Sequence, residues 1–164
     1  MPEIEQGVSS IYVFLDAGMF IGAFLEGDRR HAEARHWVEH ARSGALPACT
    51  TASVLSEVYG ALTWEKAEPR HGPSEAATAV KLIVEPPSAI EVLEEGRDVI
   101  LRTMELAAKY GLRARRIHDA RHAATALTAG VRSVYTYDLD DWGIFQSEGL
   151  QIMGPPTVTS LFGD

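Results

Sequence analysis

The sequence predicts a single α/β domain in which helices cover both faces of a central, mostly parallel sheet, and three observations favour this fold. Apolar segments of strand length alternate along the chain with segments of helical periodicity. The first, residues 11–15, is apolar at every position, as is typical of a strand buried on both faces of a parallel sheet. No repeat or long linker divides the 164 residues, of which 46% are hydrophobic. We therefore expect one three-layer α/β/α domain over 1–164, with 1–10 as an N-terminal extension.

Two helices are expected after the first strand. One covers about 19–25 and is broken by Gly27. The other covers about 30–42 and ends at Gly44, since glycine is the residue that most often ends a helix. Its expected core face consists of apolar residues at helical spacing, namely Ala34, Trp37, Val38 and Ala41.

The rest of the chain continues the alternation. A strand over 46–49 contains Pro47, which has no amide donor, so this strand is expected at a sheet edge or with the proline among its first residues. The boundaries of the later helices come from caps and breakers, namely Thr50 or Thr51, Ser74, Pro86, Pro87, Gly111 and Gly130. The remaining expected elements are helices over 52–63, 74–85, 95–110 and 119–129, and strands over 90–93, 131–137 and 150–153.

Composition excludes several classes of protein. A net charge of −8 and a pI near 5.2 argue against a protein that holds nucleic acid by blanket electrostatic attraction. Cys49 is the only cysteine, which rules out an internal disulfide and indicates a reducing compartment. No segment reaches the ~18 apolar residues of a membrane span, and residues 1–10 lack a secretory core. We expect a cytoplasmic protein with no membrane association.

Four acidic residues stand at positions where sheet proteins build sites. Asp16 follows the first strand, and Asp138 follows the strand over 131–137. Asp119 opens a helix, and Glu57 lies at the edge of an apolar helical stripe. Taken singly, each has an ordinary explanation: a helix cap for Asp16 and Asp119, a surface glutamate for Glu57, and an acidic turn for 138–141.

Together, these carboxylates predict a metal site. In a doubly wound sheet, residues that follow the strands meet at one edge, where functional sites lie. Carboxylates that are packed together repel, and a hard cation with oxygen ligands relieves that repulsion. Magnesium binds through few carboxylates, keeps several waters and engages substrate phosphates, which suits hydrolysis of a phosphodiester bond.

Four segments resemble PIN-domain nucleases, and in particular the VapC-type toxins of toxin–antitoxin modules. They follow one another in the order found in that family, and they are IYVFLDAGMFIGAFLEGD, TTASVLSEVYGAL, HDARHAATALTAG and VYTYDLDDW. The resemblance implies a PIN-like domain that cleaves RNA with magnesium or manganese. It also implies a homodimer and a cognate antitoxin that blocks the site.

The resemblance assigns roles residue by residue. The four acidic positions of the family correspond to Asp16, Glu57, Asp119 and Asp138, which would be the catalytic, metal-binding set. Thr136 corresponds to the supporting hydroxyl of the family, and Asp141, before Trp142, to an auxiliary ligand. The sequence departs from the pattern directly after Asp16: Ala17 and Gly18 stand where the family usually has serine or threonine.

Other residues have two explanations each. Arg113, Arg115 and Arg116 form a basic cluster that either holds RNA phosphates or is a solvated turn, and Arg121 is a further candidate of this kind. The pairs His36–His40 and His118–His122 have ligand spacing, but no third ligand follows, so surface histidines are favoured. Cys49 is expected to be a buried apolar residue.

Alternatives to a nuclease stay open on the sequence alone. A phosphatase with an aspartate nucleophile needs a second aspartate two residues after the first, where Gly18 stands. A phosphoacceptor signalling domain needs an aspartate after the third strand and a lysine after the last, and neither is present. A PIN-like scaffold that binds RNA without cleaving it is compatible with Ala17 and Gly18.

Overall fold

A computed structural model of the chain describes residues 11–153, and it contains the predicted alternation of strands and helices. The strands are β1 (Val13–Leu15), β2 (Ala48–Thr51), β3 (Glu91–Leu93), β4 (Ser133–Tyr135) and β5 (Gln151–Ile152). The α-helices are α2 (Ala17–Phe24), α3 (His31–Ser43), α4 (Ala52–Thr63), α5 (Pro73–Val84), α6 (Arg97–Tyr110), α7 (Ile117–Thr128) and α8 (Leu139–Gly143). Two 3₁₀-helices, η1 (Ala114–Arg116) and η2 (Ile144–Glu148), complete these elements.

The strands form one sheet in the order β3-β2-β1-β4-β5, and each neighbouring pair is parallel. Of the two alternatives for the second strand, an edge position or a proline at its start, the structure favours the second, because β2 lies between β3 and β1 and begins directly after Pro47. Pro47 is tolerated because it directly precedes β2, where no ladder amide is needed, and its carbonyl accepts a hydrogen bond from Val13 N–H at 2.9 Å.

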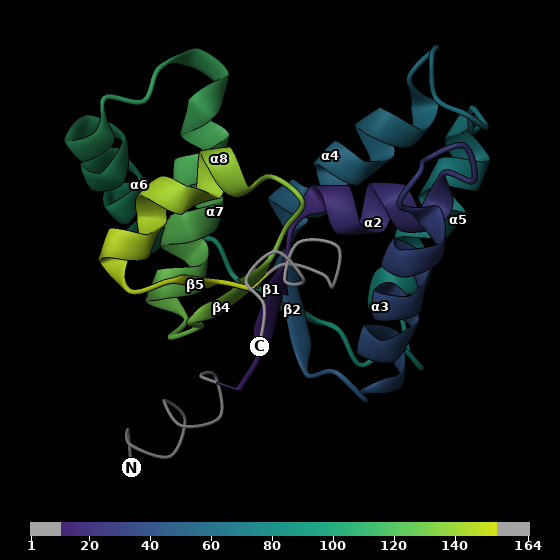
Figure 1. The fold of residues 1–164 in the computed structure, drawn as a ribbon, viewed down its shortest axis with the longest axis horizontal. Helices are drawn as coiled ribbons and strands as arrows, with labels where there is room; N and C mark the ends of the chain where they lie inside the picture. Colours follow the sequence, from purple (N-terminus) through teal and green to yellow (C-terminus); the bar gives the residue numbers. More distant parts are fainter. Residues whose placement is uncertain (1–10, 154–164) are drawn as a thin grey trace.

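The predicted three layers are confirmed (Figure 1). Helices α2 to α5 lie on one side of the sheet, and α6 to α8 lie on the other. From β1 the chain first builds outward through β2 and β3, then returns to the other side of β1 to add β4 and β5. Right-handed crossovers place the helices of these two halves on opposite faces. The side on which new strands are added therefore changes between β1 and β4, although the two strands are parallel. In such sheets, functional sites lie at the carboxyl ends of the strands on either side of this change.

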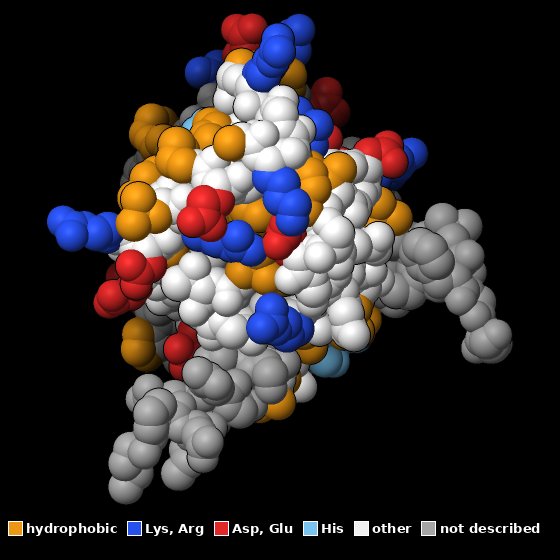
Figure 2. Space-filling model, turned by 90° about the vertical axis from the view of Figure 1, so that its left-hand side faces the viewer, with side chains coloured by type: hydrophobic (Ala, Val, Ile, Leu, Met, Phe, Trp, Pro, Cys, Tyr) orange, Lys and Arg blue, Asp and Glu red, His pale blue; other side chains and the backbone are white. Residues whose placement is uncertain are grey.

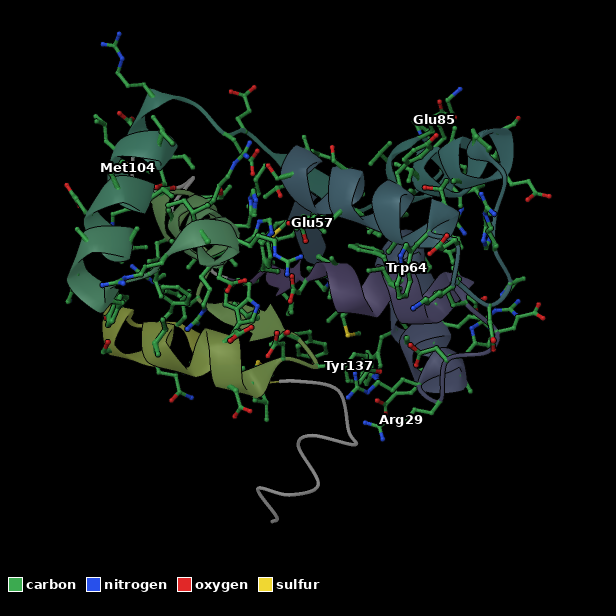
Figure 3. All side chains as sticks on the ribbon, turned by 90° about the horizontal axis from the view of Figure 1, so that it is seen from above. Arg29, Glu57, Trp64, Glu85, Met104 and Tyr137 are labelled. Atoms are coloured by element: carbon green, nitrogen blue, oxygen red, sulfur yellow. The ribbon has the colours of Figure 1, made fainter. Side chains whose placement is uncertain are left out.

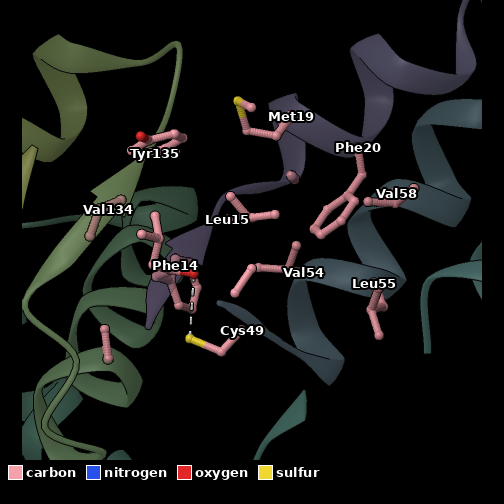
Figure 4. Packing of buried hydrophobic residues seen from close by; sticks show 14 of the residues in the cluster. Phe14, Leu15, Met19, Phe20, Cys49, Val54, Leu55, Val58, Val134 and Tyr135 are labelled. Carbon is pink, nitrogen blue, oxygen red and sulfur yellow. Dashed lines mark hydrogen bonds between the residues drawn. The ribbon is translucent and has the colours of Figure 1, made fainter. Parts of the chain in front are cut away.

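The core consists of the fully buried strand β1 and the helix faces packed on it. Phe14, Leu15, Met19 and Phe20 have no exposed surface (Figure 4). Cys49 is also buried, and its thiol lies 3.7 Å from the carbonyl oxygen of Val13. Burial raises the pKa of this thiol to about 12, so the predicted role as an apolar core residue is confirmed.

Most predicted helix boundaries are confirmed by the caps. Gly44 and Gly111 end their helices with φ of +83° and +63°, which favour glycine. The side chain of Thr51 caps α4 by accepting from Val54 N–H. The cap predicted at Ser74 is wrong: α5 begins at Pro73, and the Glu75 side chain accepts from Gly72 N–H at 2.9 Å.

The segment between β4 and β5 was not predicted to be helical, but it forms α8 and η2. None of the helices within 11–153 is long and apolar enough to cross a membrane. Figure 2 shows the face that carries α6, where hydrophobic side chains are interspersed with charged ones. Ile100, Leu101 and Met104 of α6 are exposed.

Glu148 fastens η2 to α6 and gives a test of this packing. Its side chain is 9% exposed, and its carboxylate accepts from Arg102 Nη2 at 2.8 Å, Lys109 Nζ at 2.6 Å and Tyr110 OH at 2.8 Å. The hydrogen bond from Lys109, followed by that from Tyr110, holds the pKa of Glu148 below its usual value. A depressed carboxyl pKa stabilises the fold above the unfolded-state pKa, and this stabilisation is lost as pH falls through the folded-state pKa.

We therefore expect Glu148→Gln to lower the free energy of unfolding at pH 7 by about 1–2 kcal/mol. The difference from wild type should be smaller at a pH low enough to protonate the wild-type carboxylate, that is, below its lowered pKa, because both side chains are then neutral. Urea unfolding at both pH values measures it. Glu105→Gln is the matched control, since Glu105 is more exposed and, among the residues the structure describes, pairs with Arg102 alone. An equal loss at both pH values would show that charge at Glu148 does not hold η2 to α6.

Candidate active site

The predicted acidic residues gather near the carboxyl ends of β1 and β4. Asp16 directly follows β1, and Asp138 lies three residues after the end of β4. Figure 3, which views the molecule from this edge, shows Glu57 between the two groups of helices. The fold thus brings residues that are 120 positions apart in sequence within hydrogen-bonding distance.

Three donors fix the carboxylate of Asp16. Its Oδ1 accepts from Ala17 N–H at 2.8 Å, which makes Asp16 the N-cap of α2. Its Oδ2 accepts from Thr136 Oγ1 at 2.9 Å and from Trp142 Nε1 at 3.0 Å. Of the two alternatives left open on the sequence, a cap and a site residue, the structure shows that Asp16 caps α2. The carboxylate is oriented by groups from two other segments, beyond what a cap requires.

Thr136 and Asp138 connect this carboxylate to α8. Thr136 is fully buried, and its Oγ1 accepts from Asp138 N–H at 3.0 Å while donating to Asp16. The side chain of Asp138 caps α8 by accepting from Asp141 N–H at 3.3 Å. The hydroxyl of Thr136 therefore links the Asp16 carboxylate to the backbone at the start of α8.

Trp142 was missed as a site residue by the sequence reasoning. Its indole is almost completely buried and packs at tilted and edge-on angles against Phe14 and Phe145, while its N–H reaches Asp16. Within the sequence, the only signal was an aromatic residue directly after Asp141. That signal identifies a packing residue but does not reveal which polar group its N–H meets.

Asp119 lies in the first turn of α7 and is not its cap, because the helix begins two residues earlier, at Ile117. Burial, and then the charge of Asp141, raises the pKa of Asp119 against the opposing effect of Arg116. Asp16 adds to the increase. Arg116 lies between two acids, with Nε 3.4 Å from Asp119 Oδ2 and Nη2 3.3 Å from Asp141 Oδ1.

Asp138 has a raised pKa for similar reasons. Burial has the largest effect, followed by the side-chain hydrogen bond with Asp141, and the charge of Asp119 contributes. Carboxylates that raise one another's pKa lack sufficient positive charge nearby. Their oxygen atoms are also the ligands that magnesium and manganese prefer. The chemistry of this donor set therefore fits a hard divalent cation.

Glu57 reaches the region from α4 and meets a buried histidine. Its side chain is 41% exposed, and its Oε1 lies 2.8 Å from Nε2 of His122, whose side chain is 3% exposed. Burial acts to lower the pKa of His122, but the hydrogen bond and charge of Glu57 outweigh it, so the pKa is raised. The expectation of a surface histidine is wrong for His122, since α7 turns this side chain toward Phe14 of β1.

The four acids do not converge on one point. Glu57 and Asp119 line a cavity of about 640 Å³, while Asp16 and Asp138 line a neighbouring hollow of about 300 Å³. Between residues 11 and 153, no three His, Cys, Asp or Glu side chains are arranged closely enough to enclose a metal ion. The side chains therefore form two adjacent acidic groups around the ends of β1 and β4.

The basic candidates differ in their surroundings. Arg116 is paired with acids of the site, and Arg121 is paired with Glu95 at 2.9 Å. Arg113 and Arg115 are exposed, and Arg115 lines the larger cavity. Of these four, Arg121 and Arg115 face that cavity, and Arg116 balances the charge of Asp119 and Asp141.

The smaller hollow has a wall that the sequence did not indicate. Arg30 and Tyr137 line it, with the guanidinium carbon 4.3 Å from the centre of the ring. The hydroxyl of Tyr137 donates to Glu33 at 2.8 Å. Gly18 also lines this hollow, and a Cβ there would meet, within residues 11–153, no atom nearer than Tyr137 Cδ2 at 4.0 Å. The position that departs from the family pattern therefore borders open space.

Comparisons with known proteins agree with this fold. The sequence matches the PIN domain over residues 13–142. Among solved structures, the chain resembles the Mycobacterium tuberculosis toxin VapC20, described as cleaving the sarcin-ricin loop. The TM-score is 0.63 at 21% identity, over 85% of this chain and 96% of that one.

A second similar structure belongs to a toxin–antitoxin complex from Klebsiella pneumoniae, with a TM-score of 0.55 and 20% identity. The match covers 79% of this chain and 89% of that one. No curated protein sequence matches the chain significantly. The family match spans β1 to α8 and includes each of the predicted acidic residues from Asp16 to Asp141. This chain belongs to the PIN domain family.

Proposed function

We propose that this PIN domain is a metal-dependent endoribonuclease, and that it is the toxin of a toxin–antitoxin pair. The observation that carries the proposal is the Asp16 carboxylate, which Ala17 N–H, Thr136 and Trp142 orient next to further acids with raised pKa values. A charge cluster of this kind is poorly suited to holding RNA by attraction alone, since RNA is itself anionic. It is well suited to a divalent cation that bridges protein and phosphate.

Asp16, Glu57, Asp119 and Asp138 would hold Mg²⁺ or Mn²⁺, with Asp141 as an auxiliary ligand. The bound ion would supply charge neutralisation at the scissile phosphate and activation of water for its hydrolysis. Thr136 and Trp142 orient Asp16 through their hydrogen bonds to Oδ2. His122 orients Glu57, and Arg116 balances the charge of Asp119 and Asp141. No protein nucleophile is required, and the buried thiol of Cys49 lies in the core.

The biological role rests on the fold of the relatives. The two similar structures are described as a VapC toxin that cleaves the sarcin-ricin loop and as a toxin–antitoxin complex. From these relatives we infer that this chain acts on RNA in the cytoplasm and forms a homodimer. We also infer a cognate antitoxin that blocks its site. The exposed apolar residues of α6 provide surface that a protein partner would cover.

The purified protein should cleave structured RNA when Mg²⁺ or Mn²⁺ is present and should stop when EDTA removes the ion. The physical reason is that the acids repel phosphate until a cation neutralises them. Gel analysis of a panel of RNAs, including a hairpin with the sarcin-ricin loop sequence, measures this. RNAs that are bound but left intact at each metal concentration would favour a non-catalytic PIN-like scaffold over a nuclease.

Expression of the chain alone should slow growth, and co-expression of its antitoxin, sought among neighbouring reading frames, should restore it. The Asp16→Asn variant is the control, because it should accumulate without slowing growth if cleavage causes the effect. Growth curves with protein levels measured in parallel give the answer. Normal growth at high levels of folded wild-type protein would contradict the toxin assignment.

A further inference from the structure

The larger cavity has one wall that the proposed cleavage chemistry does not use. Glu57 and Asp119 stand on one side, and Arg115, His118 and Arg121 contribute groups that bind anions. Glu95, which precedes α6, and Ser53 of α4 complete this part of the lining. On the sequence, Arg121 was one of four basic candidates for RNA contact, and Glu95 was not a candidate. The net charge of the chain is −8, so a cluster of basic side chains beside the acids is a local exception.

Arg121 is held by a nearly buried carboxylate. Its Nη2 donates to Glu95 Oε2 at 2.9 Å, and Ser53 Oγ donates to the same oxygen at 2.6 Å. The side chain of Glu95 is only 10% exposed, whereas that of Arg121 is 41% exposed. A surface ion pair between two mobile side chains has little orienting effect. Here one partner is fixed in the protein, so the guanidinium is held in place with one side open to the cavity.

The remaining donors of Arg121 are available to an anion. A guanidinium has five N–H groups in a planar fork, and within residues 11–153 only Nη2 makes a hydrogen bond. Such a fork matches the oxygens of a phosphate better than a lysine ammonium does. Arg116, by contrast, is occupied by Asp119 and Asp141. Arg121 is thus the anchored cation that faces the cavity beside Glu57 and Asp119.

We propose that Arg121 binds a backbone phosphate of RNA next to the one that is cleaved, and that Glu95 is the positioning residue that aims its guanidinium into the cavity. The proposal rests on the proposed ribonuclease function for the identity of the polyanion. Glu95 acts through Arg121 and does not itself touch the RNA. The cavity then holds the strand beside the acids, which lets an acidic protein bind an anionic substrate at one defined place.

The test measures RNA binding separately from cleavage. A fluorescein-labelled RNA hairpin is titrated with the Asp16→Asn protein at several salt concentrations, and the same titration is made with Arg121→Gln, Arg121→Lys and Glu95→Gln added to that background. Arg121→Gln should raise Kd about 10-fold at low salt and reduce the slope of log K against log salt by about one. Arg121→Lys should keep most of the slope but recover only part of the affinity, because it lacks the fork.

Glu95→Gln should raise Kd by about 3-fold and leave the slope of log K against log salt unchanged. The charge on Arg121 remains, and only the orientation of its guanidinium is lost. In the cleaving protein, Arg121→Gln and Glu95→Gln should raise KM with kcat nearly unchanged, as expected for a contact made equally before and during reaction. Arg70→Gln, an exposed arginine outside the cavity, is the charge-matched control and should change neither Kd nor the slope by a comparable amount.

Arg121→Gln alone leaves the buried carboxylate of Glu95 without its cation, so it is paired with the double variant Arg121→Gln/Glu95→Gln, which restores neutrality. The double variant should fold and show the binding defect of Arg121→Gln. Wild-type affinity and salt slope in the folded double variant would overturn the proposal, whether or not the wild-type protein cleaves RNA. Binding that depends on Arg121 in a wild-type protein that cuts no RNA would support this subsite and contradict the nuclease function alone.

Discussion

Replacing Asp16 with asparagine should abolish RNA cleavage and change the stability of the metal-free protein only slightly. Asparagine keeps the shape of the side chain and can still accept the capping hydrogen bond from Ala17 N–H. The lost charge relieves repulsion with Asp119, whose pKa Asp16 helps to raise. Against this, the amide group cannot accept from Trp142 at Oδ2 as the carboxylate does, which costs about 1–2 kcal/mol.

The loss of cleavage should be at least ~100-fold, because even groups that only support a metal ligand contribute ~10–100-fold. Initial rates of RNA cleavage, together with urea unfolding in EDTA, measure both effects. Asp140→Asn is the matched control: it removes the same charge from an exposed neighbour of Asp138 outside the proposed ligand set. If Asp16→Asn cleaves RNA as fast as Asp140→Asn, then Asp16 serves only as a helix cap and is not part of the active site.

Replacing Trp142 with phenylalanine is expected to damage both the core and the site. The phenyl ring can occupy much of the space between Phe14 and Phe145, but it lacks the N–H that donates to Asp16. We expect a loss of about 1–3 kcal/mol in the free energy of unfolding, from the vacated volume and the missing hydrogen bond. Cleavage should fall by ~10–100-fold, as for other groups that orient a metal ligand.

Phe145→Leu separates the two effects, since it also removes volume next to Trp142 but no hydrogen bond to Asp16. Its unfolding free energy should fall by a similar amount while its cleavage rate stays close to wild type. Equal losses of activity in the two variants, at matched stability, would mean that Trp142 contributes through packing alone.

The order of elements was predictable because it depends on local pattern. Strand and helix limits follow from neighbouring residues alone, as the apolar run 11–15, the glycines that end helices and the threonine cap show. The sheet order and the exclusively parallel pairing were predictable only as a class, and the position of β2 was uncertain because Pro47 is compatible with either an edge or a strand start. The helical segment 139–148 was missed, since its acidic start is equally typical of a turn.

The site was predictable in composition but not in contacts. The strand ends predicted that the four acids would meet at one edge of the sheet. The structure brings Asp16, Asp119 and Asp138 near one another there, but with Glu57 they form two groups and not one. The partners that orient these acids lie far away in sequence, and nothing local indicates that Trp142 reaches Asp16 or that His122 reaches Glu57. Histidine spacing along α7 was ambiguous because burial depends on how the helix is rotated against β1.

Glu95 shows the same limit in another way. It stands in a run of acidic residues between β3 and α6, which on the sequence resembles a solvated turn. This carboxylate is buried because α4 and α7 pack around it. Ser53 of α4 and Arg121 of α7 then donate hydrogen bonds to it. Tertiary contacts of this kind cannot be derived from spacing or propensity.

Thermal melts with and without Mn²⁺ test the central claim most directly, namely that the acids near the ends of β1 and β4 bind a divalent cation. A ligand that binds only the folded state stabilises it by about 2.7 kcal/mol at a hundredfold excess over its dissociation constant. Wild type and Asp140→Asn should gain this stabilisation, and Asp16→Asn should gain clearly less because it has lost a ligand. An equal shift in all three proteins, or no shift in wild type, would contradict the account.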